Sequence, residues 1–379
     1  MDMTKKMKTD SDRQAKKGKV VIGMSGGVDS SVAAALLVDM GYDVTGMTMK
    51  LWHYTSKACN VKEADNLCCS VESIEMARRV ARKLGIDYIV VNVEERFKSE
   101  IVDDFISCYA QGLTPNPCVI CNERIKFGAF RQKAQVIDSD YIATGHYARV
   151  EHDSVSQRHI LKRANDLSKD QSYMLYRLDQ EQLSKAVFPI GELKKTEVRK
   201  IAADMGLEMA DKPDSQEICF IPQGDYRQFL LECNPELGKS GDIVDESGRI
   251  LGRHSGTAMY TYGQRKGLGA LGPDPMYVVD IVPEENLLVV GNASATESKT
   301  LIASNLNFIP FDFLKKDMKV TAKIRYLSQD SPAILIPLNG DTVRVEFEFP
   351  QKSITPGQSV VFYDHDVVVG GGIIQRCVK

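Results

Sequence analysis

The chain has 379 residues, a length that usually divides into two or three domains of about 150 residues each. Its composition, 43% apolar and 26% charged, is typical of a globular protein and excludes a mostly disordered or fibrous chain. The 48 basic and 51 acidic residues give a net charge of −3, so a polyanionic partner has to be held by a local basic surface and not by the overall charge.

Hydropathy and cysteine content indicate the cellular compartment. The longest apolar runs, such as residues 32–38, are far shorter than the roughly 20 residues that span a bilayer, which excludes a membrane-spanning chain. Residues 1–18 lack an apolar signal core and are expected to form a disordered tail. The nine cysteines are an odd number in a chain with no export signal, so they predict reduced thiols and a cytoplasmic location.

The first half of the sequence alternates between short β-branched runs and helical periodicity. Strands are predicted over residues 19–24, 42–49, 88–93 and 141–144. Helices are predicted over residues 29–40, 71–84, 126–136 and 194–206. This alternation predicts a doubly wound parallel α/β sheet, in which ligands bind at the carboxyl ends of the strands.

The texture of the sequence changes after about residue 225. Helical periodicity gives way to short β-rich runs separated by turn signals, such as the Pro356-Gly357 pair. We therefore expect an α/β catalytic domain over residues 19–225, a small central β-containing domain over residues 226–295 and a C-terminal β-barrel over residues 296–379.

Residues 25–30 read Ser-Gly-Gly-Val-Asp-Ser and join the first predicted strand to the first predicted helix. Backbone N–H groups and the positive end of a helix converge at such a loop, and two glycines let the main chain approach phosphate oxygens closely. The Lys-Ser/Thr ending of a Walker loop is absent. An ordinary strand-to-helix turn is the alternative interpretation.

The loop resembles the pyrophosphate loop (PP-loop) of the ATP pyrophosphatase superfamily, whose members split ATP into AMP and pyrophosphate while adenylating a carbonyl oxygen. Within that superfamily the whole chain resembles the tRNA-specific 2-thiouridylase family, which places sulfur at C2 of the wobble uridine, position 34 of tRNA. The supporting motifs, in family order, are GMSGGVDSS (23–31), TPNPCVICN (114–122), ATGHY (143–147), KDQSY (169–173), DSQEICF (214–220) and KIRY (323–326).

The resemblance implies a set of binding residues. ATP is expected to contact the loop and two further positions, which together are Gly23, Met24, Ser25, Gly26, Gly27, Val28, Asp29, Ser30, Met49 and Gly145. The target base is expected beside Asn116, Pro117 and Cys118, and further tRNA contacts are expected at Lys169, Asp170, Gln171, Arg325 and Tyr326. Mg²⁺ is expected with ATP, and Asp29 is the nearest candidate to organise it.

Two cysteines are the expected catalytic residues. We expect Cys121 near a helix N-terminus with Arg124 and Lys126 close in sequence, and both features favour the nucleophilic thiolate. Cys219 by itself is typical of a buried core thiol, but the resemblance implies that it carries a persulfide. The fold has to bring these two distant residues together.

Metal binding is the alternative use of the cysteines. Cys118 and Cys121 have the spacing of metal ligands, and Cys68 and Cys69 are further candidates for a zinc or iron–sulfur site. The usual family residue at position 118 is aspartate, so the role of Cys118 as a base contact is open. A second Cys-x-x-Cys pair is absent from the sequence, and we predict no metal site.

The resemblance implies a reaction in three steps. The C2 oxygen of the uridine, in the anticodon stem-loop of tRNA, attacks the α-phosphorus of ATP. A persulfide on Cys219, loaded by a cysteine desulfurase or a sulfur-relay protein, then supplies sulfur by direct attack or as sulfide released by Cys121. Both routes end with a Cys121–Cys219 disulfide.

Two other functions are weighed against this transferase. One is another ATP-adenylating PP-loop enzyme that modifies tRNA or forms an amide and needs no paired thiols. The other is a nucleotide-binding or RNA-binding regulator without turnover. The sequence leaves open which tRNAs are modified, which protein donates sulfur, whether Cys118 and Cys121 bind zinc or an iron–sulfur cluster, and the oligomeric state.

Overall fold

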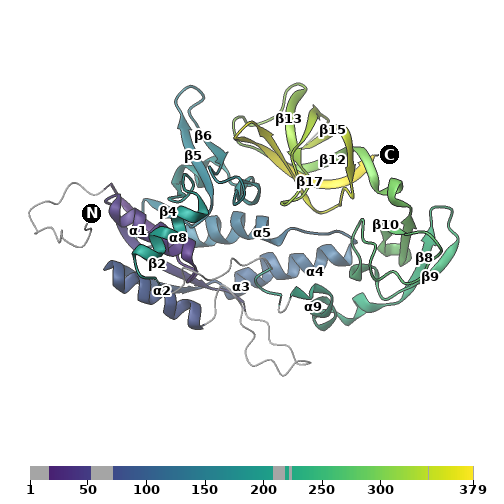
Figure 1. The fold of residues 1–379 in the computed structure, drawn as a ribbon, viewed down its shortest axis with the longest axis horizontal. Coiled ribbons are helices and arrows are strands. Elements are labelled where there is room, and N and C mark those ends of the chain that lie inside the picture. Colours follow the sequence, from purple (N-terminus) through teal and green to yellow (C-terminus); the bar gives the residue numbers. More distant parts are fainter. Residues whose placement is uncertain (1–16, 53–70, 208–217, 222–223, 340, 379) are drawn as a thin grey trace, which may run out of the picture.

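The structure is a computed structural model that describes residues 17–52, 71–207, 218–221, 224–339 and 341–378. The chain forms an elongated molecule with an α/β domain at one end, a small β-rich domain at the other and a β-barrel that packs above the helices between them (Figure 1). The tail predicted over residues 1–18 lies outside the described residues except for its last two positions.

A parallel sheet forms the core of the N-terminal domain, which confirms the predicted fold class. Among the described residues its strand order is β3-β2-β1-β4-β7, and each neighbouring pair is parallel. The strands are β1 (Lys19–Gly23), β2 (Asp43–Lys50), β3 (Asp87–Asn92), β4 (Tyr141–Ala143) and β7 (Ala186–Val187).

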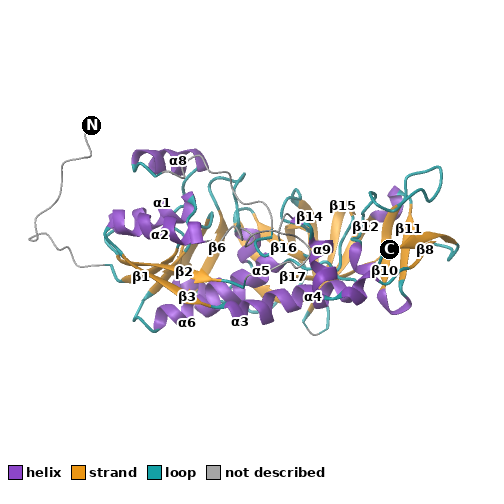
Figure 2. Cartoon of the chain, turned by 90° about the horizontal axis from the view of Figure 1, so that it is seen from below, coloured by secondary structure: helices purple, strands orange, loops and turns teal. Residues whose placement is uncertain are grey.

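Helices cover both faces of this sheet, as a doubly wound fold requires (Figure 2). On one face lie α1 (Val28–Asp39), α2 (Val71–Leu84) and α8 (Lys195–Asp204). Helix α1 is buried on most sides, because the apolar run that includes Val32 and Leu37 packs under both neighbouring helices. Helix α2 matches its predicted bounds, and Gly85 ends it with a left-handed backbone at φ +69°.

The order of the strands creates a switch point at β1. The chain runs from β1 outward to β2 and β3, and β4 then returns to the other side of β1, where Ile22 pairs with Ala143. The loops that follow β1 and β4 therefore leave the sheet side by side at its carboxyl edge. Such an edge is where doubly wound sheets bind ligands.

Two long helical segments cover the other face of the sheet and extend toward the central domain (Figures 1 and 2). The first joins α3 (Glu94–Phe97), the π-helical segment η1 (Lys98–Val102) and α4 (Asp103–Ala110). The second joins α5 (Pro117–Ile120), the π-helical segment η2 (Cys121–Ala129) and α6 (Phe130–Gln135).

The prediction that the second segment begins at residue 126 was wrong. The helix begins at Pro117, because proline is well suited to the first helical position and Asn116 caps it: Asn116 Oδ1 accepts a hydrogen bond from the Val119 N–H at 3.4 Å. None of the helices in the described part of the chain is long and apolar enough to cross a bilayer.

The central domain packs tightly on these helical segments. It contains α9 (Tyr226–Cys233) and a sheet with the order β10-β11-β8-β9. Its strands are β8 (Gly241–Asp245), β9 (Ile250–His254), β10 (Tyr277–Val282) and β11 (Leu287–Gly291). Three phenylalanine rings meet edge to face within one core, with ring centroids 5.5 to 6.2 Å apart. They belong to Phe105 on α4, Phe229 on α9 and Phe220, which precedes α9.

The C-terminal domain is a closed antiparallel barrel, because its first and last strands pair with each other. Its strands are β12 (Glu297–Phe308), β13 (Met318–Lys323), β14 (Ser331–Pro337), β15 (Thr342–Lys352), β16 (Ser359–Asp364) and β17 (Val367–Val378). Fully buried residues such as Leu301, Leu335 and Val345 fill the interior.

A hairpin of the N-terminal domain extends the barrel sheet, which the sequence analysis did not anticipate. The hairpin consists of β5 (Ala148–Asp153) and β6 (Arg158–Arg163), and Lys162 of β6 pairs with Val367 of β17. The short helix α7 (Gln180–Lys185) packs against β6. The N-terminal and C-terminal domains therefore share a core, in which Tyr173 lies near Tyr363.

The turn before β16 also holds the stretch that precedes α5. Gln358 Nε2 donates hydrogen bonds to the carbonyl oxygens of Thr114 at 2.9 Å and Pro115 at 3.2 Å. The Thr114 N–H in turn donates to Pro356 O at 2.9 Å. A Cβ atom on Gly357 would lie 2.8 Å from Thr114 N, so the two backbones touch. The barrel thus fixes the entry to α5.

We predict that Gln358→Ala loosens this entry. The variant loses two hydrogen bonds to buried or half-buried carbonyl groups, so its free energy of unfolding should fall by about 1 to 2 kcal/mol. The amide hydrogen of Thr114 should exchange with solvent faster, measured by hydrogen–deuterium exchange. Gln375→Ala is the matched control, since Gln375 is an exposed barrel glutamine whose Nε2 donates to nearby Ile373 O at 3.4 Å. Equal exchange in both variants would contradict this role.

Candidate functional site

The glycine loop lies between β1 and α1 at the switch point of the sheet. Its N-cap residue is Gly27 in an extended conformation, which carries no side chain that could cover the first amides of α1. Serine side chains brace the loop from inside: Ser30 Oγ donates to Gly27 O at 3.1 Å, and Ser31 Oγ donates to the same oxygen at 2.8 Å. The Ser25 N–H donates to Ser30 Oγ at 3.3 Å. The loop is therefore a rigid turn suited to an anion.

Gly26 has a specific steric role in this loop. Its φ of +73° lies in the left-handed region, and a Cβ atom at this position would lie 2.4 Å from the carbonyl oxygen of Ser73. Ser73 belongs to the first turn of α2. Only glycine permits this approach, so the loop and α2 hold each other in place.

The loop after β4 packs against the N-terminal end of α1. A Cβ atom on Gly145 would lie 2.7 Å from Ser30 N and 2.8 Å from the carbonyl carbon of Asp29. The structure therefore places Gly145, predicted to contact adenosine, directly beside the predicted phosphate loop. Met49, the other predicted adenosine contact, lies near the end of the neighbouring strand β2 and is half-buried.

Asp29 is held by two residues that the sequence analysis missed. Lys195 Nζ lies 2.8 Å from both carboxylate oxygens, and Tyr147 Oη donates to Oδ1 at 2.8 Å. Lys195 is only 8% exposed. Tyr147 stands in the ATGHY motif and could have been found there, whereas Lys195 has no local sequence signal because it lies 166 positions from Asp29.

The two predicted catalytic cysteines belong to one apolar cluster. Cys121 is 8% exposed within the core that also contains Phe220, and Cys219 is half-buried and packs against that core. Met49 packs against it as well, so the cluster reaches the carboxyl edge of the sheet. The two residues are 98 positions apart in the sequence, and the structure places both in or against this one cluster, which sequence reasoning could not establish.

Cys121 lies further into its helix than the sequence predicted. It follows the first turn, and its N–H already donates to the carbonyl oxygens of Pro117 and Cys118. Arg124 is exposed and Lys126 is half-buried. Cys121 therefore lies one turn beyond the helix N-terminus at which it was expected, since the helix begins at Pro117, which has no N–H, and its first amides belong to residues 118–120.

Asn116, Pro117 and Cys118 form the first turn of α5, and Cys118 is half-buried. The side chain of Asn116 also approaches Met174 Sδ at 3.9 Å, and Asn122 Nδ2 donates to Met174 O at 3.0 Å. Met174 belongs to the 3₁₀ helix Ser172–Leu175. This links the predicted base-binding turn to the segment that carries the predicted tRNA contacts.

Residues 169–171, the predicted tRNA contacts, are buried or half-buried and not fully exposed. Asp170 is only 9% exposed and accepts hydrogen bonds from the N–H groups of Ala164 and Ser172. Gln171 Oε1 accepts from the Tyr147 N–H at 3.0 Å, which ties this loop to the ATGHY motif. Lys169 is half-buried. Contact of these side chains with tRNA stays a prediction, and the structure gives Asp170 and Gln171 a role in shaping the loop.

Arg325 and Tyr326 lie in the turn after β13, not on a strand. The ring of Tyr326 lies 5.9 Å from the ring of Tyr173, between centroids, and Arg325 is exposed. The structure therefore brings this turn of the barrel to the 3₁₀ helix that follows Gln171. Their contact with tRNA is likewise a prediction.

His146 lies beside the site but is buried. Burial, followed by the charge of Lys126, holds the pKa of His146 well below its ordinary value of 6.5. Its Nδ1 lies 2.7 Å from Thr144 Oγ1. His146 is therefore a neutral, buried imidazole beside the site.

The described residues offer little to a protein-bound metal. Among them there is no group of three or more histidine, cysteine, aspartate or glutamate side chains arranged to hold an ion. Both oxygens of Asp29, the expected organiser of Mg²⁺, are bound to Lys195. Cys68 and Cys69, the candidates for an additional metal site, lie outside the described residues.

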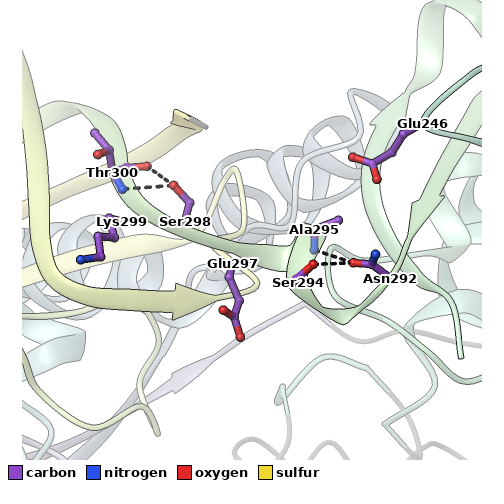
Figure 3. A pocket seen from close by; sticks show the side chains of 8 residues that line it. All are labelled: Glu246, Asn292, Ser294, Ala295, Glu297, Ser298, Lys299 and Thr300. Carbon is purple, nitrogen blue, oxygen red and sulfur yellow. Dashed lines mark hydrogen bonds between the residues drawn. The ribbon is translucent and has the colours of Figure 1, made fainter.

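A surface hollow of about 580 Å³ lies away from these residues, at the junction of the central domain and the barrel (Figure 3). It is lined by Glu246, Asn292, Ser294, Ala295, Glu297, Ser298, Lys299 and Thr300. Hydrogen bonds such as Ser294 Oγ to Asn292 Oδ1 at 2.7 Å close within the lining. None of the predicted site residues contributes to it.

Family models match nearly the whole described chain. The tRNA methyl transferase HUP domain matches residues 18–223, the tRNA methyl transferase PRC-barrel domain matches residues 227–292, and the aminomethyltransferase beta-barrel domain matches residues 298–374. The matched ranges correspond to the parallel sheet, the central sheet and the barrel.

Curated relatives are similar over almost their full length. A tRNA-specific 2-thiouridylase of Caldanaerobacter subterraneus is 50% identical over 96% of this chain and 100% of its own. A tRNA-specific 2-thiouridylase of Clostridioides difficile is 49% identical over 94% of this chain and 98% of its own. A solved structure of a 4-thiouridine synthetase with RNA and bound ATP aligns with 58% of this chain and 51% of its own, at 17% identity and a low TM-score of 0.33.

We predict that Gly26→Ala disrupts the glycine loop. The added methyl group would overlap the Ser73 carbonyl, so the loop has to move, and ATP affinity should fall at least about tenfold. Gly41→Ala is the matched control, because Gly41 also has a positive φ, +86°, but has no atom within 4 Å of its added Cβ. Titration calorimetry with ATP and thermal unfolding of both variants measure the difference. Similar ATP affinities in the two variants would contradict the steric role.

We also predict a pH dependence from His146. The folded protein holds this histidine neutral while the unfolded chain protonates it near pH 6.5, so stability is lost as the pH falls below that value. The loss should reach at most about 1.4 kcal/mol per pH unit for this group. His146→Gln should flatten the profile between pH 6.5 and 5 in denaturant unfolding. An unchanged slope in His146→Gln would refute this assignment.

Proposed function

This chain belongs to the tRNA-specific 2-thiouridylase family, and we propose that it uses ATP to replace the C2 oxygen of the wobble uridine of tRNA by sulfur. The single observation that carries the proposal is the position of Cys121 and Cys219 in one apolar cluster that reaches Met49 at the carboxyl edge of the sheet, where the glycine loop lies. Nucleotide chemistry and thiol chemistry can therefore act on one bound base.

The glycine loop suits the phosphates of ATP. The backbone packs so closely at Gly26 and Gly145 that neither position has room for a Cβ atom. Gly27, the N-cap of α1, has no side chain, so it leaves the first amides of α1 uncovered. These groups stabilise the charge of the departing pyrophosphate when the C2 oxygen of uridine attacks the α-phosphorus. The uridine C2 oxygen then leaves with AMP and not as hydroxide.

The described residues do not form a site that fits a magnesium ion. Both Asp29 oxygens are bound to Lys195, and the part of the chain that the structure describes has no cluster of acidic ligands. A magnesium ion that accompanies ATP would thus be held by phosphate oxygens, and we derive no step from it.

Sulfur transfer uses the two cysteines in sequence. The terminal sulfur of a Cys219 persulfide attacks C2 and displaces AMP. The Cys121 thiolate then attacks the sulfur of Cys219, the persulfide S–S bond breaks, and its electrons remain on the sulfur bound to C2. Alternatively Cys121 attacks first and releases sulfide, which attacks C2. In both routes a Cys121–Cys219 disulfide forms, which a cellular reductant has to open.

The substrate contacts fit a base turned out of the anticodon stack. The first turn of α5, with Asn116 and Cys118, adjoins the 3₁₀ helix Ser172–Leu175, and Tyr326 of the barrel packs beside Tyr173 of that helix. Enzymes that act on a base inside stacked nucleic acid extrude it into such a pocket. Arg325, Lys169 and Gln171 would then lie toward the anticodon stem-loop, and a cysteine desulfurase or relay protein would load Cys219.

Two further functions remain to be separated by experiment. The first is an amide-forming or other adenylating PP-loop enzyme, which needs no paired thiols. The second is a methyl transferase, because the family models of the first two domains carry that description. Mass analysis of tRNA nucleosides from cells that lack the gene distinguishes them. Loss of a 2-thio group at the wobble uridine supports the proposal, and loss of a methyl group, or no loss, contradicts it.

We predict that Cys121→Ser and Cys219→Ser each abolish thiolation in a purified assay, because either substitution prevents the closing disulfide. Cys219→Ser should still release pyrophosphate when tRNA is added, since adenylation precedes sulfur transfer. Cys233→Ser, at an exposed position on α9, is the control and should keep full activity. Thiolated uridine and pyrophosphate are measured separately, and full thiolation by either Cys121→Ser or Cys219→Ser would rule out the sulfur-transfer mechanism.

A further inference from the structure

A buried lysine reaches the nucleotide loop from a distant helix, an observation whose interpretation rests on the proposed use of ATP. Lys195 begins α8, and this helix packs across α1. The Lys195 side chain is 9% exposed, and its ammonium lies 2.8 Å from both oxygens of Asp29. Asp29 occupies the second position of α1, beside the amides that suit phosphate.

The position of Lys195 is fixed from the opposite side. Its backbone N–H donates to Asp166 Oδ2 at 2.9 Å, and this hydrogen bond is the main reason that the pKa of Asp166 is lowered. Tyr147, which also donates to Asp29, exchanges two hydrogen bonds with Gln171: Tyr147 N–H to Gln171 Oε1 and Gln171 N–H to Tyr147 O. The Asp29 carboxylate is thus held by two residues that are themselves anchored to the loop 165–171.

The charge of this carboxylate matters for an anionic ligand. A bare carboxylate at the second position of α1 would repel the ATP phosphates. Near a protein surface, the repulsion energy between two unit charges up to about 8 Å apart is larger than the free energy that corresponds to a tenfold loss of affinity. An ammonium bound to both oxygens cancels that charge. Because Lys195 is buried, solvent and salt screen the pair less than they screen a surface ion pair.

We propose that Lys195 is a positioning residue for ATP, which neutralises Asp29 and holds it in place so that the N-terminus of α1 can receive the triphosphate. Lys195 acts through Asp29 and not by touching the phosphates. The pair therefore sets the electrostatic potential at the glycine loop. The loss of ATP affinity on removal of the ammonium should be reversed when the carboxylate is removed as well.

The test is a double-mutant cycle on the full-length enzyme, with the dissociation constant of α,β-methylene-ATP measured by titration calorimetry without tRNA. Lys195→Met should weaken binding at least about tenfold, because the carboxylate is left bare. Asp29→Asn combined with Lys195→Met should restore binding to within a factor of about three of the unmodified enzyme, and Lys195→Arg should retain it within the same factor. Lys200→Met, at an exposed position on α8, is the matched control and should bind normally.

Two outcomes would overturn the proposal. Normal binding by Lys195→Met would show that the ammonium is dispensable, and a double variant as weak as Lys195→Met would show that Lys195 contacts phosphate itself. If thermal unfolding shows that Lys195→Met does not fold, the double variant has no unpaired buried charge and carries the test alone: binding near that of the unmodified enzyme supports the proposal, and weak binding rejects it. An unmodified enzyme that fails to bind the nucleotide would contradict the proposed function itself.

Discussion

The site depends on close contact between backbones at the switch point of the parallel sheet. Gly26 touches the carbonyl of Ser73 in α2, and Gly145 touches the backbone of Asp29 and Ser30 in α1. Because neither contact has room for a Cβ atom, the loops after β1 and β4 and the starts of two helices are fixed relative to one another. A phosphate group is bound well by amides that are already oriented, since little order has to be gained on binding.

The thiol side of the site is assembled by all three domains. The helix that carries Cys121 belongs to the N-terminal domain, but its core is completed by α9 and the central sheet. The barrel holds the entry to that helix through Gln358 and packs Tyr326 beside Tyr173. The domains share cores, so a rigid arrangement is favoured over domains that move independently.

The two halves of the site differ in character, as the chemistry requires. The glycine loop is polar and held by serine hydroxyls and a buried ion pair, which suits a highly charged leaving group. The cysteines lie in or against an apolar cluster with Phe220, in which Cys121 is buried and Cys219 is half-buried. Met49 packs on that cluster from the sheet edge and links the two halves.

Local patterns determined much of this protein. Helix α2 matched its expected bounds because its apolar spacing and Gly85 are local signals, and the strand, glycine loop and helix at residues 19–40 were also recognisable from local signals. The start of α5 was misplaced because two prolines indicated an extended lead-in, whereas Pro117 in fact occupies the first helical position after the Asn116 cap. Only the tertiary structure decided that Lys195 and Tyr147 hold Asp29, that a hairpin joins the barrel and that Cys121 and Cys219 share one core. Such contacts join residues that are tens to hundreds of positions apart, and their formation depends on how the whole chain packs, which no local periodicity encodes.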